Sequence, residues 1–458
     1  MENAKLKSIY PATGELVAEY NYHNQADIDR IVLLAGQAQS DWSTSSFDMR
    51  KGLVMRVAEI LREKAGEYGR IITMEMGKPL KQSVAEIEKC AAVCEYYVEN
   101  AEKFLSREYV SAGGSESFIS FRPLGVILAI MPWNFPFWQV FRFAAPALMA
   151  GNGILLKHAS NVTGSALAIE SLFREAGIAA NTFRTLKVSS NRVESLIEHP
   201  VIKAVTITGS VNAGKAVAAK AGMELKKSVL ELGGSDPYII LEDADMKNAV
   251  PTCINSRLIN SGQSCIAAKR FIVIKSRLTE FEESFVAGMK EKKMGDPLDV
   301  KNDLGPQAST SLRDDLHRQV KESVQKGAVC LLGGVIPEDK GAWYPPTVLT
   351  NVRPGMPAYN EEMFGPVAAI IRAENEADAI RIANDTKFGL GAAVFTSDME
   401  KGKYIAENQI SAGSCFVNDL VRSDPRLPFG GLENSGYGRE LSYLGIREFV
   451  NIKTVYIK

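Results

Sequence analysis

One of the six cysteines, Cys265, lies where a sulfur atom could do chemistry. It closes the small polar segment 260–265 (NSGQSC), which lies between an apolar helical pattern and a strand-like run. A loop in this position can present a sulfur atom to a cleft, where its thiolate would be a nucleophile. A lone cysteine is more often a small buried hydrophobic residue, so the role of Cys265 depends on its neighbours.

Glu231 could supply a base. It lies in segment 230–234 (LELGG), where two glycines allow the backbone to turn sharply. Partial burial among apolar residues would raise the pKa of its carboxyl group toward the range of a useful general base. A solvated or salt-bridged glutamate is the alternative for this residue taken alone.

Asn134 could stabilise a developing negative charge. It lies in segment 132–136 (PWNFP), where two prolines stiffen the backbone directly after the apolar run 126–130. An amide NH2 group held at the carboxyl end of a strand can donate to an oxyanion. The alternative is a turn asparagine that bonds its own backbone.

Segment 209–214 (GSVNAG) could bind a phosphate. It follows the strand-like run 204–208 and opens a helical pattern, so backbone NH groups at the helix N-terminus could face a pyrophosphate. The segment is not the G-x-G-x-x-G fingerprint, and taken alone it is weak evidence for a nucleotide site.

The apolar runs that would position these residues are short and continuous, as expected for strands buried on both faces. They are 126–130, 153–157, 204–208, 238–241 and 271–274. The runs fall into two regions, 126–208 and 238–274, and the intervals between the runs of each region are long enough for crossover helices. This alternation predicts a parallel α/β fold, which often binds dinucleotides at the carboxyl ends of its strands.

Two helices have recognisable starts. Asn24 followed by Asp27 predicts a helix N-cap before an apolar stripe that begins at Ile28. Thr279 with Glu282 predicts a capping box at the start of a helix that buries the apolar residues after it.

Length and composition narrow the class of protein. A chain of 458 residues is expected to form two or three structural units, and its net charge of −1 indicates neither a nucleic-acid partner nor an anionic membrane partner. The start of the chain lacks a signal-peptide profile, so we expect a cytoplasmic protein with mostly reduced cysteines. Four scattered histidines give poor support to a metal site, and none is expected.

The segment 111–122, with Gly113 and Gly114 near its middle, predicts a protruding hairpin, and the tail 449–458 is strand-like. Such strands could add edges to a sheet shared with another subunit. An ordinary surface hairpin with a frayed tail is the alternative.

Six segments together resemble the aldehyde dehydrogenase superfamily in identity, order and spacing. They are 132–136, 209–214, 231–234, 262–265, 362–366 (EMFGP) and 428–431 (PFGG). The resemblance implies an α/β fold with a Rossmann-type dinucleotide-binding domain at 1–110 and 125–230, an α/β catalytic domain at 231–439, and a small β oligomerisation domain at 111–124 and 440–458. Homodimers or homotetramers are usual in such proteins.

The resemblance also implies roles for the site residues. Cys265 would be the nucleophile, Asn134 and the Cys265 backbone NH the oxyanion hole, and Glu231 the general base. NAD or NADP would be the cofactor, with Glu362 on the nicotinamide ribose, Phe364 beside the nicotinamide, and Lys157 on the adenine ribose. The other expected cofactor-binding residues are Trp133, Ser160, Gly209 and Ser210.

At Ser160 the sequence departs from many NAD-preferring members, which carry a glutamate there to bind the ribose hydroxyls and repel a 2'-phosphate. This chain reads Lys157-His158-Ala159-Ser160. Without that negative charge, and with positive charge from Lys157 and His158 nearby, NADP should be tolerated.

A second departure concerns the substrate. Arg142 lies eight residues after Asn134. An arginine at this position resembles the sequences of the succinate semialdehyde dehydrogenases, whereas many members have an apolar or aromatic residue there. A substrate carboxylate would be a bidentate partner for a cation on an apolar helix, and a neighbouring acid is the alternative. Ser423 and Arg426 are secondary candidates for the carboxylate end, although some relatives carry a further arginine where this chain has Ile259.

Three alternatives remain open at this point. The enzyme could oxidise another small aldehyde, it could pass the acyl group to coenzyme A, or the chain could be a non-catalytic family member that acts as a binding protein. Members that use coenzyme A often lack the glutamate in the position of Glu231, and Cys265 and Asn134 are also present.

Overall fold

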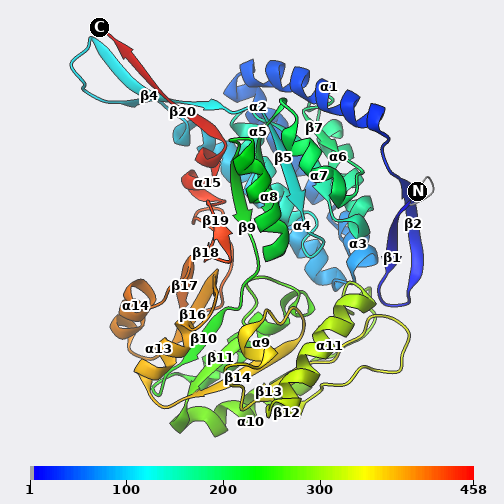
Figure 1. Ribbon diagram of the computed structural model, residues 1–458, viewed down its shortest axis with the longest axis vertical. Coiled ribbons are helices and arrows are strands. Elements are labelled where there is room, and N and C mark those ends of the chain that lie inside the picture. The colour runs from blue at the N-terminus through cyan, green and yellow to red at the C-terminus, as the bar shows by residue number, and fades with distance from the viewer. Residues whose placement is uncertain (1–4) are drawn as a thin grey trace.

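The computed structural model describes residues 5–458, and its core contains two mostly parallel sheets, the first with only its edge strand β19 antiparallel to its neighbour (Figure 1). The first sheet has the order β19-β9-β8-β5-β6-β7. Its strands are β5 (Val126–Met131), β6 (Gly153–His158), β7 (Phe183–Thr185), β8 (Ile202–Thr208), β9 (Lys227–Glu231) and β19 (Gly436–Tyr437). The predicted strands at 126–130, 153–157 and 204–208 are therefore confirmed.

Both faces of this sheet are covered, which explains the apolar runs in its central strands. Val126 and Leu128 of β5 pack with α1 (Gln25–Thr44), α7 (Val193–Glu198) and α8 (Val211–Met223). Their neighbours Ile127 and Ala129 pack on the opposite side, because successive strand residues face opposite ways. The helices there are α2 (Phe47–Glu63), α3 (Ala65–Met76), α4 (Leu80–Phe104), α5 (Trp138–Met149) and α6 (Thr163–Glu175).

The second sheet has the order β12-β13-β14-β11-β10-β16-β17, with only β12 antiparallel to its neighbour. Its strands are β10 (Pro237–Ile240), β11 (Arg270–Ile274), β12 (Val329–Leu332), β13 (Thr347–Thr350), β14 (Val367–Ala373), β16 (Gly391–Phe395) and β17 (Ser414–Val417). The helices of this part are α9 (Met246–Leu258), α10 (Leu278–Lys290), α11 (Thr310–Gln325), α12 (Pro357–Asn360), α13 (Glu376–Asn384) and α14 (Met399–Asn408). The predicted strands at 238–241 and 271–274 are β10 and β11, so the α/β fold class is confirmed.

A third, antiparallel sheet forms an arm that extends from the body, with the C-terminus near its tip (Figure 1). In it β4 (Glu116–Pro123) pairs with β3 (Glu108–Tyr109) on one side and with β20 (Val450–Ile457) on the other. The predicted hairpin and strand-like tail are therefore confirmed, and the frayed tail is not observed. The domain limits given above remain a prediction.

The two predicted helix starts had different outcomes. The Asn24 side chain accepts a hydrogen bond from the Asp27 backbone NH and caps α1, as predicted. The capping box at Thr279 is wrong, because α10 begins at Leu278 without a side-chain cap and Glu282 instead accepts a hydrogen bond from the Thr350 hydroxyl of β13. Phe281, Phe285 and Met289 of this helix are nevertheless buried as expected.

Two further antiparallel pairings lie outside these sheets. β1 (Lys5–Tyr10) pairs with β2 (Glu15–Asn21), and β15 (Phe388–Gly389) pairs with β18 (Leu432–Glu433). The last helix is α15 (Ser442–Glu448). No helix in the part of the chain that the structure describes is long and apolar enough to cross a membrane.

Candidate active site

Cys265 follows a strained backbone segment at the end of α9. Asn260 and Ser261 both have φ values of 53°, in the left-handed region that residues other than glycine rarely adopt. The Asn260 amide holds this turn by donating to the carbonyl oxygens of Asn134 at 2.7 Å and Gln263 at 3.1 Å. Strain that is held by surrounding contacts in this way is typical of functional sites.

Gly262 allows this nucleophile loop, 260–265, to lie directly against another segment. Its φ of 78° favours glycine, and a β-carbon here would collide with the Gly365 backbone. Segment 362–366 therefore packs backbone to backbone against the nucleophile loop. Two of the six segments that carry the family resemblance meet at this contact.

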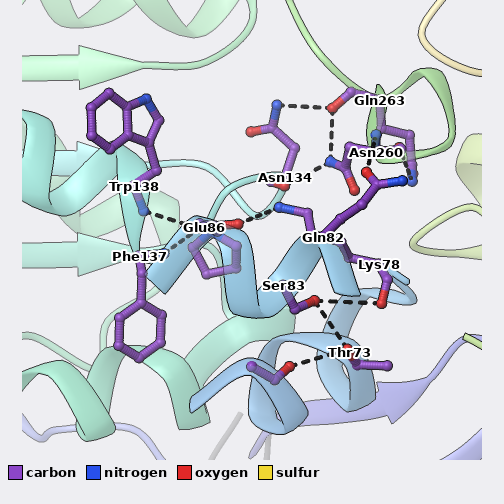
Figure 2. Close-up of polar contacts among 12 residues, drawn as sticks. Thr73, Lys78, Gln82, Ser83, Glu86, Asn134, Phe137, Trp138, Asn260 and Gln263 are labelled. Carbon is purple, nitrogen blue, oxygen red and sulfur yellow. Dashed lines mark hydrogen bonds and ion pairs between the residues drawn. The ribbon is translucent and has the colours of Figure 1, made fainter. Parts of the chain in front are cut away.

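Asn134 lies beside the nucleophile loop, although it comes from the first sheet. Its side-chain amide donates to the Gln263 carbonyl at 3.1 Å, and the residue is buried (Figure 2). This contact excludes the alternative of a turn asparagine that bonds only its own backbone. Because an amide group has two N–H donors, one remains for a substrate oxygen.

A buried carboxylate from α4 positions the segment that carries Asn134. One oxygen of Glu86 accepts hydrogen bonds from the backbone NH groups of Phe137 and Trp138, both at 2.9 Å, and the other pairs with Lys78 (Figure 2). A negative charge at the first turn of α5 is favourable, because the helix N-terminus is positive. Glu86 was not singled out in the sequence, because nothing nearby in the chain marks its partners.

Cys265 is half-buried, and burial raises the pKa of its thiol to about 12, while Lys269 and Arg142 oppose this shift. The thiol is therefore protonated near neutral pH and needs a base before it can attack. The Lys269 ammonium donates to the carbonyl oxygens of Ser264 at 2.8 Å and Cys265 at 2.5 Å. Lys269 is thus a further residue that fixes the loop, and sequence reasoning missed it.

Glu231 ends β9, and its carboxyl group is buried. Neither of its oxygens has a hydrogen-bond partner among residues 5–458. Burial raises the pKa of Glu231 well above its usual value, Arg142 lowers it and Glu440 raises it further. The alternative of a solvated or salt-bridged glutamate is therefore not observed, and the group has the high proton affinity of a general base.

The segment after Glu231 meets the nucleophile loop directly. A β-carbon on Gly234 would lie 2.7 Å from the Cys265 carbonyl oxygen, and the Gly234 backbone NH donates to Glu362 at 3.0 Å. The three segments that carry Glu231, Cys265 and Glu362 therefore converge. The structure records no direct contact between the Glu231 and Cys265 side chains.

Arg142, which the sequence suggested as a ligand for the substrate carboxylate, has an acidic partner within the protein. Its guanidinium is buried on α5, forms an ion pair with Glu440 and lies 4.5 Å from the centre of the Phe429 ring. Of the two possibilities left open, the structure shows the neighbouring acid. The sequence did not indicate Glu440, because it lies almost three hundred residues further along the chain.

The two secondary substrate candidates have different surroundings in the structure. The guanidinium of Arg426 is mostly exposed and binds the Asp424 carboxylate through two hydrogen bonds of 2.8 and 2.6 Å, so it already has an acidic partner. Ser423 is buried, and its hydroxyl accepts a 2.7 Å hydrogen bond from the Lys89 ammonium. Lys89 is a second residue that sequence reasoning missed.

Lys157 and Ser160 lie together at the carboxyl end of β6, as the predicted adenosine-side site requires. Burial lowers the pKa of Lys157. The expected charge on His158 is corrected: burial lowers its pKa to about 4. Its Nδ1 accepts from the Ala159 NH, so its Nε2–H donates to the Pro136 carbonyl.

The expected phosphate-binding segment begins a helix. Gly209 follows β8, and the Ser210 hydroxyl caps α8 by accepting from the Ala213 NH at 3.3 Å. A β-carbon on Gly209 would make only ordinary van der Waals contacts with the Ile207 side chain, and Ser210 is exposed, so this helix N-terminus is accessible. Gly214 permits close packing of α8 on Leu232.

The residues expected at the nicotinamide end also lie close together. The rings of Trp133 and Phe364 are 5.7 Å apart, edge to face, and Phe364 is half-buried. Glu362 accepts from Gly234 and lies 3.6 Å from Lys269. No group of three or more histidine, cysteine or acidic side chains within the described ranges could hold a metal ion.

Comparison with known proteins agrees with this geometry. Residues 1–455 match the aldehyde dehydrogenase family. A probable succinate-semialdehyde dehydrogenase [NADP(+)] from Synechocystis is 46% identical over 99% of both chains, and a succinate semialdehyde dehydrogenase [NAD(P)+] from Escherichia coli is 46% identical over 98% of this chain and 97% of its own. A succinic semialdehyde dehydrogenase structure from Streptococcus pyogenes, in complex with NADP+, has a TM-score of 0.97 and 36% identity over 99% of each chain. The chain belongs to the aldehyde dehydrogenase family.

Proposed function

We propose that the protein oxidises succinate semialdehyde to succinate with NAD or NADP as the cofactor. The observation that carries this proposal is the convergence of Cys265, Asn134 and the Glu231 segment on one strained loop. The substrate rests on the relatives named above, each of which is described as a succinate semialdehyde dehydrogenase.

The Cys265 thiol first releases its proton to water, and the resulting thiolate attacks the aldehyde carbon. An sp2 aldehyde carbon has no hydride positioned to leave until this addition forms a tetrahedral adduct. The negative oxygen that develops would receive a hydrogen bond from the Asn134 amide and one from the Cys265 backbone NH. Asn134 is buried, so little water competes for this contact.

The residues present fit a dinucleotide. Lys157 is a partly buried ammonium group that has no ion pair with an acid in residues 5–458, and the helix N-terminus at Gly209 and Ser210 is accessible. Ser160, Glu362, Phe364 and Trp133 complete the set that would hold it. When bound, the nicotinamide would supply the hydride acceptor for this reaction.

After hydride loss the acyl group remains on Cys265 as a thioester. Glu231 would then remove a proton from the water that attacks this ester, and its raised pKa suits that task. Arg142 and Glu440 form an ion pair and act on the reaction through the buried Glu231 carboxyl group. Arg142 lowers the pKa of Glu231, and Glu440 raises it.

A comparison of three aldehydes tests the substrate. For the wild-type enzyme we expect kcat/KM to be about 100-fold higher for succinate semialdehyde than for butanal, a neutral aldehyde of the same chain length, because a carboxylate contact stabilises binding by about 1.5–3 kcal/mol. Betaine aldehyde, which is a cation, should react most slowly. Steady-state rates measured at equal cofactor concentration decide this, and faster turnover of butanal would refute the proposed substrate.

The residue at position 160 is expected to control cofactor choice. A Ser160→Glu variant should lower the ratio of kcat/KM for NADP to that for NAD by at least about tenfold, because a carboxylate there repels the 2'-phosphate. Ser160→Gln is the matched control, since it adds a similar volume without charge and should change the ratio less. An unaltered ratio in Ser160→Glu would contradict the placement of this residue.

We further infer a homodimer or homotetramer in the cytoplasm. The arm formed by β4 and β20 carries exposed apolar side chains at Ile452 and Tyr456, which a second subunit could cover. All six cysteines are free, which suits a reducing compartment.

A further inference from the structure

A cavity of about 340 Å3 lies next to the candidate active site. Phe135 and Trp138 form part of its wall, and both belong to the stretch that carries Asn134. Leu258 and Ile259, which directly precede the strained turn of the nucleophile loop, form another part. The cavity is therefore bounded by the same segments that position the nucleophile and the oxyanion donor, as expected of a substrate pocket.

Lys89 of α4 brings a positive charge to this cavity. Its ammonium nitrogen lies 4.1 Å from the centre of the Trp138 ring and donates a 2.7 Å hydrogen bond to the Ser423 hydroxyl. These contacts use one of its three N–H donors and one side of the group. The remaining donors are available to a ligand.

Two acids near Lys89 are already bound to other cations, and Asp303, which also lines the cavity, accepts a hydrogen bond from the Lys293 backbone NH. Glu86 pairs with Lys78, and Asp424 binds Arg426 through two hydrogen bonds. Lys89 itself forms no ion pair within residues 5–458. It is therefore a positive charge without an acidic partner, in a position where a partly buried charge is costly unless something compensates it.

Arg142 is a second positive charge near Lys89, so it does not compensate the charge of the lysine. Burial, followed by the positive charge of Arg142, lowers the pKa of Lys89 to about 8, and Glu86 and Asp424 only partly oppose the shift. Arg142 is itself compensated by Glu440. At neutral pH Lys89 remains mostly protonated, so the pocket presents a cation that an anionic ligand can neutralise.

We propose that Lys89, together with Ser423, binds the carboxylate of the substrate. This inference rests on the proposed function and assigns to Lys89 the contact that the sequence had assigned to Arg142. The Lys89 ammonium group and the Ser423 hydroxyl would both donate to the substrate carboxylate. The Trp138 ring would pack against the methylene chain of the substrate. The cavity should therefore favour aldehydes that carry a terminal carboxylate.

A Lys89→Met variant tests the inference, because methionine keeps much of the length of the side chain and removes its charge. We expect kcat/KM for succinate semialdehyde to fall on the order of 50-fold, mainly through a higher KM, because a charge-assisted contact is lost. The rate with butanal should stay within about threefold of wild type, which also shows that the variant is folded. The inhibition constant of succinate should rise in parallel.

Two further variants serve as controls. Lys292 lines the same cavity, and Lys292→Met removes a charge there without touching Ser423, so the preference for succinate semialdehyde should persist. Ser423→Ala should lower kcat/KM for succinate semialdehyde about fivefold, since an uncharged hydroxyl donor contributes less to binding a carboxylate than an ammonium group does.

The inference is overturned if Lys89→Met keeps the wild-type preference, or if it slows butanal and succinate semialdehyde equally. It is also overturned if Lys292→Met, and not Lys89→Met, loses the preference. A wild-type enzyme that does not prefer succinate semialdehyde over butanal would instead refute the proposed substrate, and the inference with it.

Discussion

A Cys265→Ala variant is expected to lose at least about 10⁴-fold of the dehydrogenase rate, because alanine cannot form the tetrahedral adduct from which hydride leaves. The cofactor should still bind with near wild-type affinity, since the residues proposed to hold it lie on other segments. Reduced-cofactor absorbance reports the rate, and quenching of protein fluorescence on titration with NADP reports binding.

Cys330→Ala is the matched control for this experiment. Cys330 is exposed on β12, on the edge strand of the second sheet, and its replacement should leave the rate unchanged. Full turnover by Cys265→Ala, or an equal loss in Cys330→Ala, would contradict the assignment of the nucleophile.

A Glu231→Gln variant is expected to complete the first half of the reaction and to stall in the second. Glutamine is nearly isosteric with glutamate but cannot accept a proton, so the thioester would hydrolyse slowly. Rapid mixing should show a burst of reduced cofactor of about one equivalent per active subunit, followed by a steady-state rate lower by about 100- to 1000-fold. An unchanged steady-state rate would exclude Glu231 as the base.

The acidity of Glu231 also predicts a pH dependence. Because burial raises the pKa of this carboxyl group, the fraction in the base form increases as pH rises through that raised value. The wild-type steady-state rate should therefore increase with pH on the acidic side of its profile, and Glu231→Gln should lose this limb.

Strands such as β5 and β8 could be predicted because a strand buried on both faces must be apolar throughout, and such runs stand out in the sequence. Asn134 was found for the same reason, because it follows the run 126–130, whereas Glu231 was singled out by its apolar neighbours and the two glycines after it. Their chemistry was then indicated by six segments in one order, which together outweighed the ordinary interpretation of each residue.

Partners that lie far apart in the chain could not be predicted. The charge on Arg142 was visible, but its compensation by Glu440 depends on how the C-terminal segment returns to α5. Lys89 was overlooked because a lysine on an amphipathic helix usually faces solvent, and only the folded structure places its ammonium over Trp138. The left-handed turn at Asn260 likewise depends on contacts made after folding.

The most direct test of the account is to locate the acyl group. Glu231→Gln enzyme, mixed with succinate semialdehyde and NADP and quenched in acid during the burst, should carry a succinyl group on the peptide that contains Cys265, detected by mass spectrometry. The same treatment of Cys265→Ala should give no adduct. A succinyl group on any other cysteine, or a full burst without an adduct on Cys265, would contradict the proposed mechanism.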